Sequence, residues 1–169
     1  MTQVKLMTNV NQNSTTHLTA WQRTRNEQRA LHALTQTIAT DPASLSDAVR
    51  VARTEGFASL DDLLLAAHAE WVRTFDARID VLLEAGAYGD QAAFDAVWAE
   101  TALALPGTAL LLDHHAEHPA VVRAHAQHVR RAQRVLAVDL PSTWAVAERP
   151  RRRRSCVGRL GRLPRLRVA

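Results

Sequence analysis

The fold is decided by the stretch SLDDLLLAAHAEWVRTFDARIDVLLEA, which occupies residues 59–85. Its apolar side chains recur at three-, four- and seven-residue steps, which is typical of one helix face. These residues are Leu60, Leu64, Ala67, Trp71, Phe75 and Leu82. Ser59, with Asp62 three positions later, matches a helix N-terminus. About 26 residues at a rise of about 1.5 Å make a rod of roughly 39 Å, which favours a helical bundle.

Similar patterns on both sides of this stretch predict further helices. Ser, Thr, Asp or Pro stands at most of the expected starts, and Gly or Pro follows most of the expected ends. The expected ranges are 15–41, 44–56, 90–105, 109–117 and 119–139, with a possible single turn over 142–148 around Trp144. We therefore expect an all-α bundle of about five to six helices with one long central helix.

Composition supports this fold class and divides the chain into three parts. Hydrophobic residues make up 47% of the chain and aromatic residues only 5%, which favours helices around a real core. Residues 149–169 hold nine arginines and no acid, whereas residues 1–148 hold 12 basic and 17 acidic residues. We expect a disordered N-terminal segment over 1–14, a helical body over 15–148 and a disordered basic tail over 149–169.

Several protein classes are not supported by the sequence. Cys156 is the only cysteine, so no intrachain disulfide can form. The first residues lack the apolar core of a signal peptide, and the longest apolar stretch, 102–112, is short and contains Pro106. We therefore expect a cytoplasmic protein without a membrane span.

Histidines supply the first candidate site. Neutral imidazoles are common ligands of zinc, iron and manganese. His125 falls near the centre of an apolar stripe on the last helix, His128 on the flank of that stripe and His68 on the flank of the central stripe. The candidate metal ligands are His68, His114, His118, His125 and His128. Alternatively, the core histidines are satisfied by hydrogen bonds and residues 114–118 form an exposed helix end.

Known metal motifs give this hypothesis little support. The stretch His115-Ala116-Glu117-His118 resembles hemerythrin-like proteins, over these four residues and without the spaced partner ligands. Paired Glu-x-x-His segments and His-Glu-x-x-His are absent from the sequence. Our first interpretation is therefore that the protein has no cofactor, and the alternative is that it binds a metal ion.

The arginine tail is the second candidate site, because a run of arginines neutralises phosphates without reading base sequence. Its candidate contacts are Arg151, Arg152, Arg153, Arg154, Arg159 and Arg162. No aromatic residue follows Trp144, so base stacking is unsupported. The tail could also fold back on residues 41–118, which hold four arginines and fourteen acids, or have no function.

A transcriptional regulator is a third interpretation, because residues 45–71 read as helix, turn and helix. Residues 55–71 resemble the second half of a ribbon-helix-helix repressor. However, Asp61 and Asp62 would repel phosphates at the start of the reading helix. Enzyme signatures such as a Gly-rich phosphate loop are absent from the sequence, so we expect no catalytic residues.

Two tryptophans and one arginine are further candidates for contact or packing roles. Trp21 and Trp144 lie near the ends of the predicted body, where they either anchor a partner or cover the ends of the bundle. Arg78 lies beside the central apolar stripe, and we expect its stem to follow the stripe while its head reaches water.

Our preferred interpretation is a non-catalytic helical protein that acts through protein association or self-association, with a tail that contacts nucleic acid nonspecifically. The alternative is a histidine-lined bundle that binds a metal or a small ligand.

Overall fold

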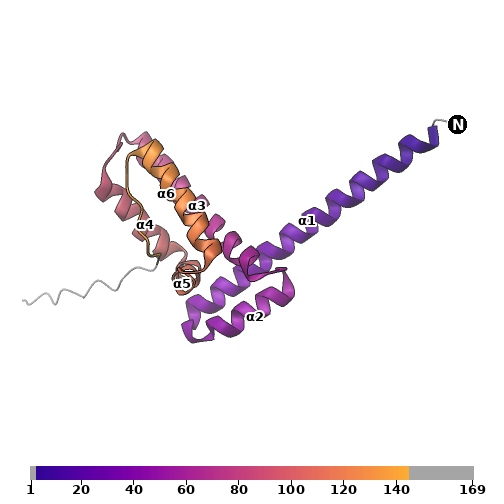
Figure 1. Ribbon diagram of the computed structural model, residues 1–169, viewed down its shortest axis with the longest axis horizontal. Helices are drawn as coiled ribbons and strands as arrows, with labels where there is room; N and C mark the ends of the chain where they lie inside the picture. The colour runs from indigo at the N-terminus through magenta and orange to yellow at the C-terminus, as the bar shows by residue number, and fades with distance from the viewer. Residues whose placement is uncertain (1–2, 145–169) are drawn as a thin grey trace, which may run out of the picture.

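The computed structural model of the protein describes the backbone of residues 3–144 and the side chains of residues 20–144. This part of the chain contains helices and no strand, which confirms the predicted all-α bundle (Figure 1). Its elements are α1 (Gln3–Thr40), the 3-10 turn η1 (Pro42–Ser44), α2 (Leu45–Glu55), α3 (Leu60–Glu84), α4 (Gln91–Ala104), α5 (Pro106–His114) and α6 (Pro119–Leu136). Within these bounds, none of the helices is both long and apolar enough to cross a membrane.

Helix α3 is the centre of the bundle, as predicted, and packs against α4, α5 and α6. Its start is capped by Ser59, whose Oγ accepts a hydrogen bond of 3.1 Å from the backbone N–H of Asp62. Leu64, Trp71 and Phe75 on the predicted stripe are at most 1% exposed. The stripe therefore forms the core against which the other helices are placed.

Helix α1 begins at Gln3 rather than near Thr15. Its second half packs against α2 and α5, whereas its first half extends away from the bundle (Figure 1). Helix propagation from a packed segment is far easier than helix nucleation. This explains why the helix extends beyond the half that packs against the bundle.

Helix α5 differs from the prediction of a helix over 109–117 capped by Thr108. It begins at Pro106, because proline is favoured at the first helical position. The Thr108 hydroxyl instead donates a hydrogen bond of 2.9 Å to Glu70 on α3. A Cβ atom on Gly107 would lie 1.9 Å from the backbone oxygen of Thr35, so α5 approaches the backbone of α1 directly.

Helix α6 begins at Pro119, as predicted, and ends at Leu136 rather than near Asp139. Residues 137–144, here called the strap, then return along the bundle without helical structure. The single helical turn predicted over 142–148 is absent at residues 142–144, and residues 145–148 lie outside the described part.

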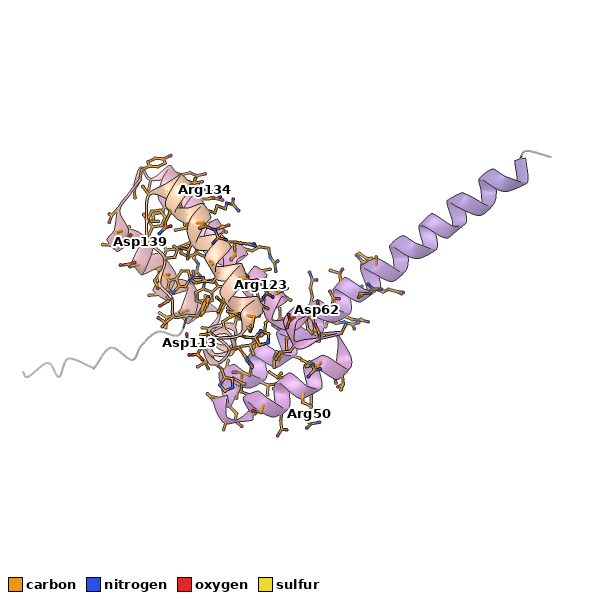
Figure 2. All side chains as sticks on the ribbon, in the orientation of Figure 1. Arg50, Asp62, Asp113, Arg123, Arg134 and Asp139 are labelled. Atoms are coloured by element: carbon orange, nitrogen blue, oxygen red, sulfur yellow. The ribbon has the colours of Figure 1, made fainter. Side chains whose placement is uncertain are left out.

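The side chain of Gln91 holds one end of the strap through two hydrogen bonds, of 2.8 and 2.9 Å, to the backbone of Asp139. Asp113 holds the other end by accepting a hydrogen bond of 2.8 Å from the backbone N–H of Trp144 (Figure 2).

Candidate metal centre

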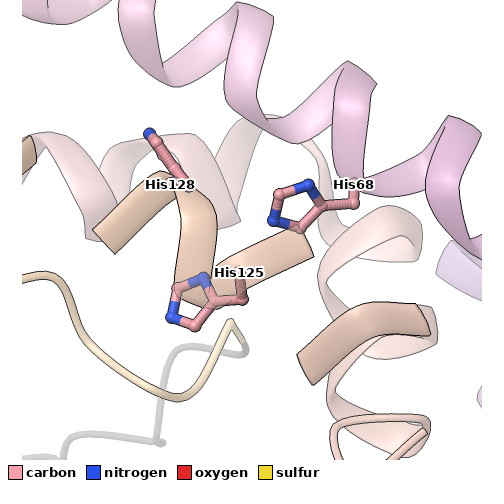
Figure 3. A group of neighbouring side chains, drawn as sticks. All are labelled: His68, His125 and His128. Atoms are coloured by element: carbon pink, nitrogen blue, oxygen red, sulfur yellow. The ribbon is translucent and has the colours of Figure 1, made fainter. Parts of the chain in front are cut away.

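Three histidines from two helices converge inside the bundle. His68 comes from α3, while His125 and His128 are three residues apart on α6 and therefore share a face (Figure 3). One ring nitrogen of each histidine lies within 4.8 Å of a ring nitrogen of each of the other two. His68 is 6% exposed and His128 is 8% exposed, and His125 is half-buried. The sequence predicted these three residues as metal ligands, and the fold brings them together.

Each of the three rings has a buried nitrogen without a hydrogen-bond partner among residues 20–144. These atoms are Nε2 of His68, Nδ1 of His125 and Nδ1 of His128. Buried polar groups are almost always hydrogen-bonded in folded proteins, so three exceptions in one cluster require an explanation. A shared cation would satisfy all three lone pairs.

The opposite nitrogens of His125 and His128 face groups that accept hydrogen bonds. Nε2 of His125 lies 3.0 Å from the backbone oxygen of Pro141 in the strap. Nε2 of His128 lies 3.5 Å from a carboxylate oxygen of Asp76 on α3. Both partners favour a proton on Nε2, which leaves the lone pair on Nδ1. Metal-binding histidines are held in the same way, by a carbonyl or carboxylate on the nitrogen away from the metal.

Burial keeps His68 and His125 uncharged. Desolvation, with smaller contributions from His125 and His128, lowers the pKa of His68 from 6.5 to about 4. Desolvation also lowers the pKa of His125, although its hydrogen bond to Pro141 acts in the opposite direction. Both rings are therefore neutral at neutral pH, and the neutral imidazole is the form that binds metals.

An aromatic shell surrounds the three histidines. The ring of Trp144 lies 4.7 Å from the ring of His125, centroid to centroid, and Phe75 lies 5.7 Å from His128. Trp98 lies 6.0 Å from His125, and its indole N–H donates a hydrogen bond of 2.8 Å to the backbone oxygen of Thr143. The strap thus places the Trp144 ring beside His68 and His125.

A small change in the positions of the three nitrogens would give the spacing of a metal site. A zinc ion about 2.1 Å from each nitrogen in a tetrahedral site would separate the nitrogens by about 3.4 Å. Ring rotations that bring the nitrogens together by up to about 1.4 Å would therefore complete the site. In the part of the chain that the structure describes, no fourth histidine, cysteine or carboxylate joins the group. Three protein ligands leave one coordination position for water or a small ligand.

The other two predicted ligands lie elsewhere. His114 is exposed at the end of α5. His118 caps α6, where its Nδ1 accepts a hydrogen bond of 3.3 Å from the backbone N–H of Ala120. Its Nε2 lies 3.6 Å from a carboxylate oxygen of Asp61. Neither joins the group that contains His68.

The two predicted tryptophan anchors have different environments. Trp21 is 59% exposed on α1, whereas Trp144 is 2% exposed and takes the packing role that was the alternative to a partner contact. The predicted arginine contacts Arg151, Arg152, Arg153, Arg154, Arg159 and Arg162 lie outside the described residues.

Sequence reasoning missed the groups that orient the ligands. Asp76 follows His68 by eight residues, close to two helical turns, and this spacing was a usable signal. The backbone oxygen of Pro141 had no such signal, because any residue offers a carbonyl.

Comparison with known proteins adds no further information about the site. No known family, curated protein or solved structure matches this chain.

Proposed function

We propose that the protein binds one divalent transition-metal ion through His68, His125 and His128. Two observations carry this proposal. One ring nitrogen of each histidine lies within 4.8 Å of a ring nitrogen of each of the others, and each ring has a buried nitrogen without a hydrogen-bond partner among the described residues. A buried polar atom without a partner costs about 1–3 kcal/mol, and one metal ion removes this cost at all three positions. This free-energy gain supports the proposal that the site holds a metal ion.

Zinc is the metal that fits the donor set best. Calcium and magnesium prefer oxygen ligands, whereas neutral imidazole suits zinc, copper, iron and nickel. Three histidines and an open fourth position match the ligand number of tetrahedral zinc sites. Copper(II) would bind the same nitrogens strongly, in accordance with the general affinity order, but it prefers a tetragonal arrangement.

The test is a zinc titration of full-length protein that has been stripped with a chelator. We expect one zinc per chain, and we expect binding to be lost in His68→Gln and His125→Gln. His32→Gln is the matched control, because His32 is an exposed histidine on α1. His118→Gln is a second control, because His118 lies outside the cluster, and it should also leave the stoichiometry at one zinc per chain.

Cobalt(II) provides a second measurement on the same protein. A cobalt ion in a tetrahedral nitrogen site gives intense visible absorption, whereas a six-coordinate surface ion gives weak bands. The proposal is wrong if stripped protein takes up no stoichiometric zinc. It is also wrong if His68→Gln and His125→Gln retain the wild-type affinity and cobalt spectrum.

Protein association is a second proposal, supported by the exposure of Trp21 on α1. The guanidinium carbon of Arg25 lies 5.1 Å from the centre of the Trp21 ring, and both side chains are exposed. An exposed tryptophan on a helix that extends from the bundle offers a partner a rigid aromatic contact. Light scattering over a concentration series should show a mass above that of the monomer, and Trp21→Ala should reduce it. A monomeric mass for wild-type protein at all concentrations would exclude self-association.

Nonspecific contact between nucleic acid and the arginine tail also stays a proposal. A gel shift in a salt series, with the full chain and with a chain that ends at Glu148, tests it directly. We expect the full chain to bind more weakly as salt rises and the shortened chain to lose binding. Equal binding by the two chains would place the contact outside the tail.

A further inference from the structure

A groove of about 780 Å³ lies between α3 and α4, and it is separate from the histidine cluster in its lining residues. Its apolar lining includes Ala77, Val81, Leu82, Ala93, Ala96 and Val97. The alanines come from both helices and leave space that larger side chains would fill. Pockets for small molecules usually have volumes of about 300–1,000 Å³ and mostly apolar walls, so the groove has the dimensions of a ligand site.

Arg78 brings a positive charge into this apolar groove. The residue is half-buried, and its Nη1 atom is buried without a hydrogen-bond partner among residues 20–144. The expectation that its head would reach water is therefore wrong for this nitrogen. Arg73 lines the same groove, and Glu100 lines the opposite wall. Across the described residues, Glu100 forms no ion pair with either arginine.

The unpartnered Nη1 atom of Arg78 indicates what kind of ligand would gain most from the groove. A charged donor that is buried without an acceptor is costly, and a carboxylate can accept two parallel hydrogen bonds from one guanidinium. The remaining groove surface offers contact to an aliphatic chain but few polar partners. From Arg78 to Ala85 the axis of α3 rises about 10 Å, which leaves room for a chain of medium length.

We propose that this groove binds a single-chain carboxylate amphiphile of the fatty-acid class. Its carboxylate is held by Arg78, with Arg73 nearby, and its aliphatic chain lies between α3 and α4 against Val81, Leu82 and Val97. The head group is selected by charge, and the chain by the apolar volume. This site uses none of the three histidines, so it does not depend on metal binding.

The experiment compares two probes of equal chain length, dodecanoate and dodecanol, by calorimetry with the full-length protein below their aggregation concentrations. We expect dodecanoate to bind at least about tenfold more tightly, in the range measured for hydrogen bonds to charged groups. Arg78→Met keeps the stem but removes the charge, and it should abolish this preference. Arg50→Met is the control, because Arg50 is exposed on α2 and lies outside the groove.

A second variant tests the groove itself. Ala96→Phe fills the space from an exposed position on α4, and it should weaken both probes while circular dichroism stays unchanged. The proposal is overturned if dodecanol binds as well as dodecanoate, or if Arg78→Met or Ala96→Phe has no effect. Concentration-dependent dimerisation that Ala96→Phe abolishes, without dodecanoate uptake, would identify a second copy of the chain as the occupant and would also overturn it.

Discussion

The carboxylate of Asp76 lies 3.5 Å from Nε2 of His128. The other ring nitrogen of His128, Nδ1, is buried and has no hydrogen-bond partner within the described residues. Asp76 comes from α3 and His128 from α6, so this contact also joins the two helices that supply the cluster. A carboxylate in this position favours the tautomer that presents the Nδ1 lone pair. Asp76 is therefore a positioning residue for the proposed metal ligand and not a ligand itself.

Replacing Asp76 with asparagine should weaken zinc binding about 10- to 100-fold, because changes to the partners of ligand histidines have effects of this size. Zinc affinity is measured by competition with a chelator of known affinity. Asp80→Asn is the control, because Asp80 is an exposed carboxylate one turn further along α3. A loss of affinity that is equal in the two variants would show that overall charge, and not the contact with His128, is responsible.

The three histidines could be predicted because each stands on or beside an apolar stripe. The spacing of residues along α3 and α6 defines which side faces the core, and His68, His125 and His128 follow that spacing. Their predicted partners His114 and His118 stand at helix ends instead, where side-chain direction depends on local capping and not on periodicity.

The strap could not be predicted, because its position depends on contacts between distant residues. Gln91 and Asp139 are 48 positions apart, and Trp98 and Thr143 are 45 positions apart. A segment without helical or strand periodicity gives no sequence signal for such contacts. The close approach of Gly107 to Thr35 was missed for the same reason, since a glycine beside a proline also fits an ordinary turn.

The stability of the metal-free protein should rise with pH between about 4 and 6.5. Burial lowers the pKa of His68 from 6.5 to about 4, so in this range the unfolded ring binds a proton and the folded ring does not. Unfolding then takes up a proton, and acid favours the unfolded state. The contribution of His68 reaches roughly 3 kcal/mol across this range and is constant above it.

Urea denaturation at a series of pH values in the presence of a chelator measures this dependence. His68→Leu removes the titrating group and should flatten the curve, while the lowered pKa of His125 leaves a smaller slope of the same sign. If the two proteins show parallel curves, His68 is not the group that couples folding to pH.

Trp144 should contribute much more to stability than Trp21. Trp144, the last residue of the strap, is 2% exposed, whereas Trp21 on α1 is 59% exposed. Removing a buried tryptophan side chain costs about 3–5 kcal/mol, whereas an exposed substitution usually changes stability by less than about 0.5 kcal/mol. Chemical denaturation of Trp144→Ala and Trp21→Ala measures the difference. Equal effects would mean that the strap does not pack against the bundle in solution.

Gly107→Ala should destabilise the protein by about 3 kcal/mol or more, since a new Cβ atom would lie 1.9 Å from the backbone oxygen of Thr35. Neither α1 nor α5 can relieve this overlap by a side-chain rotation, because the opposing atom belongs to the backbone. Gly89→Ala is the control: it has φ of +72° but no atom within 4 Å of the added Cβ, so only backbone strain of about 1–2 kcal/mol applies. Thermal denaturation of the two variants compares the costs. A smaller loss for Gly107→Ala than for Gly89→Ala would show that α5 does not pack against the backbone of α1.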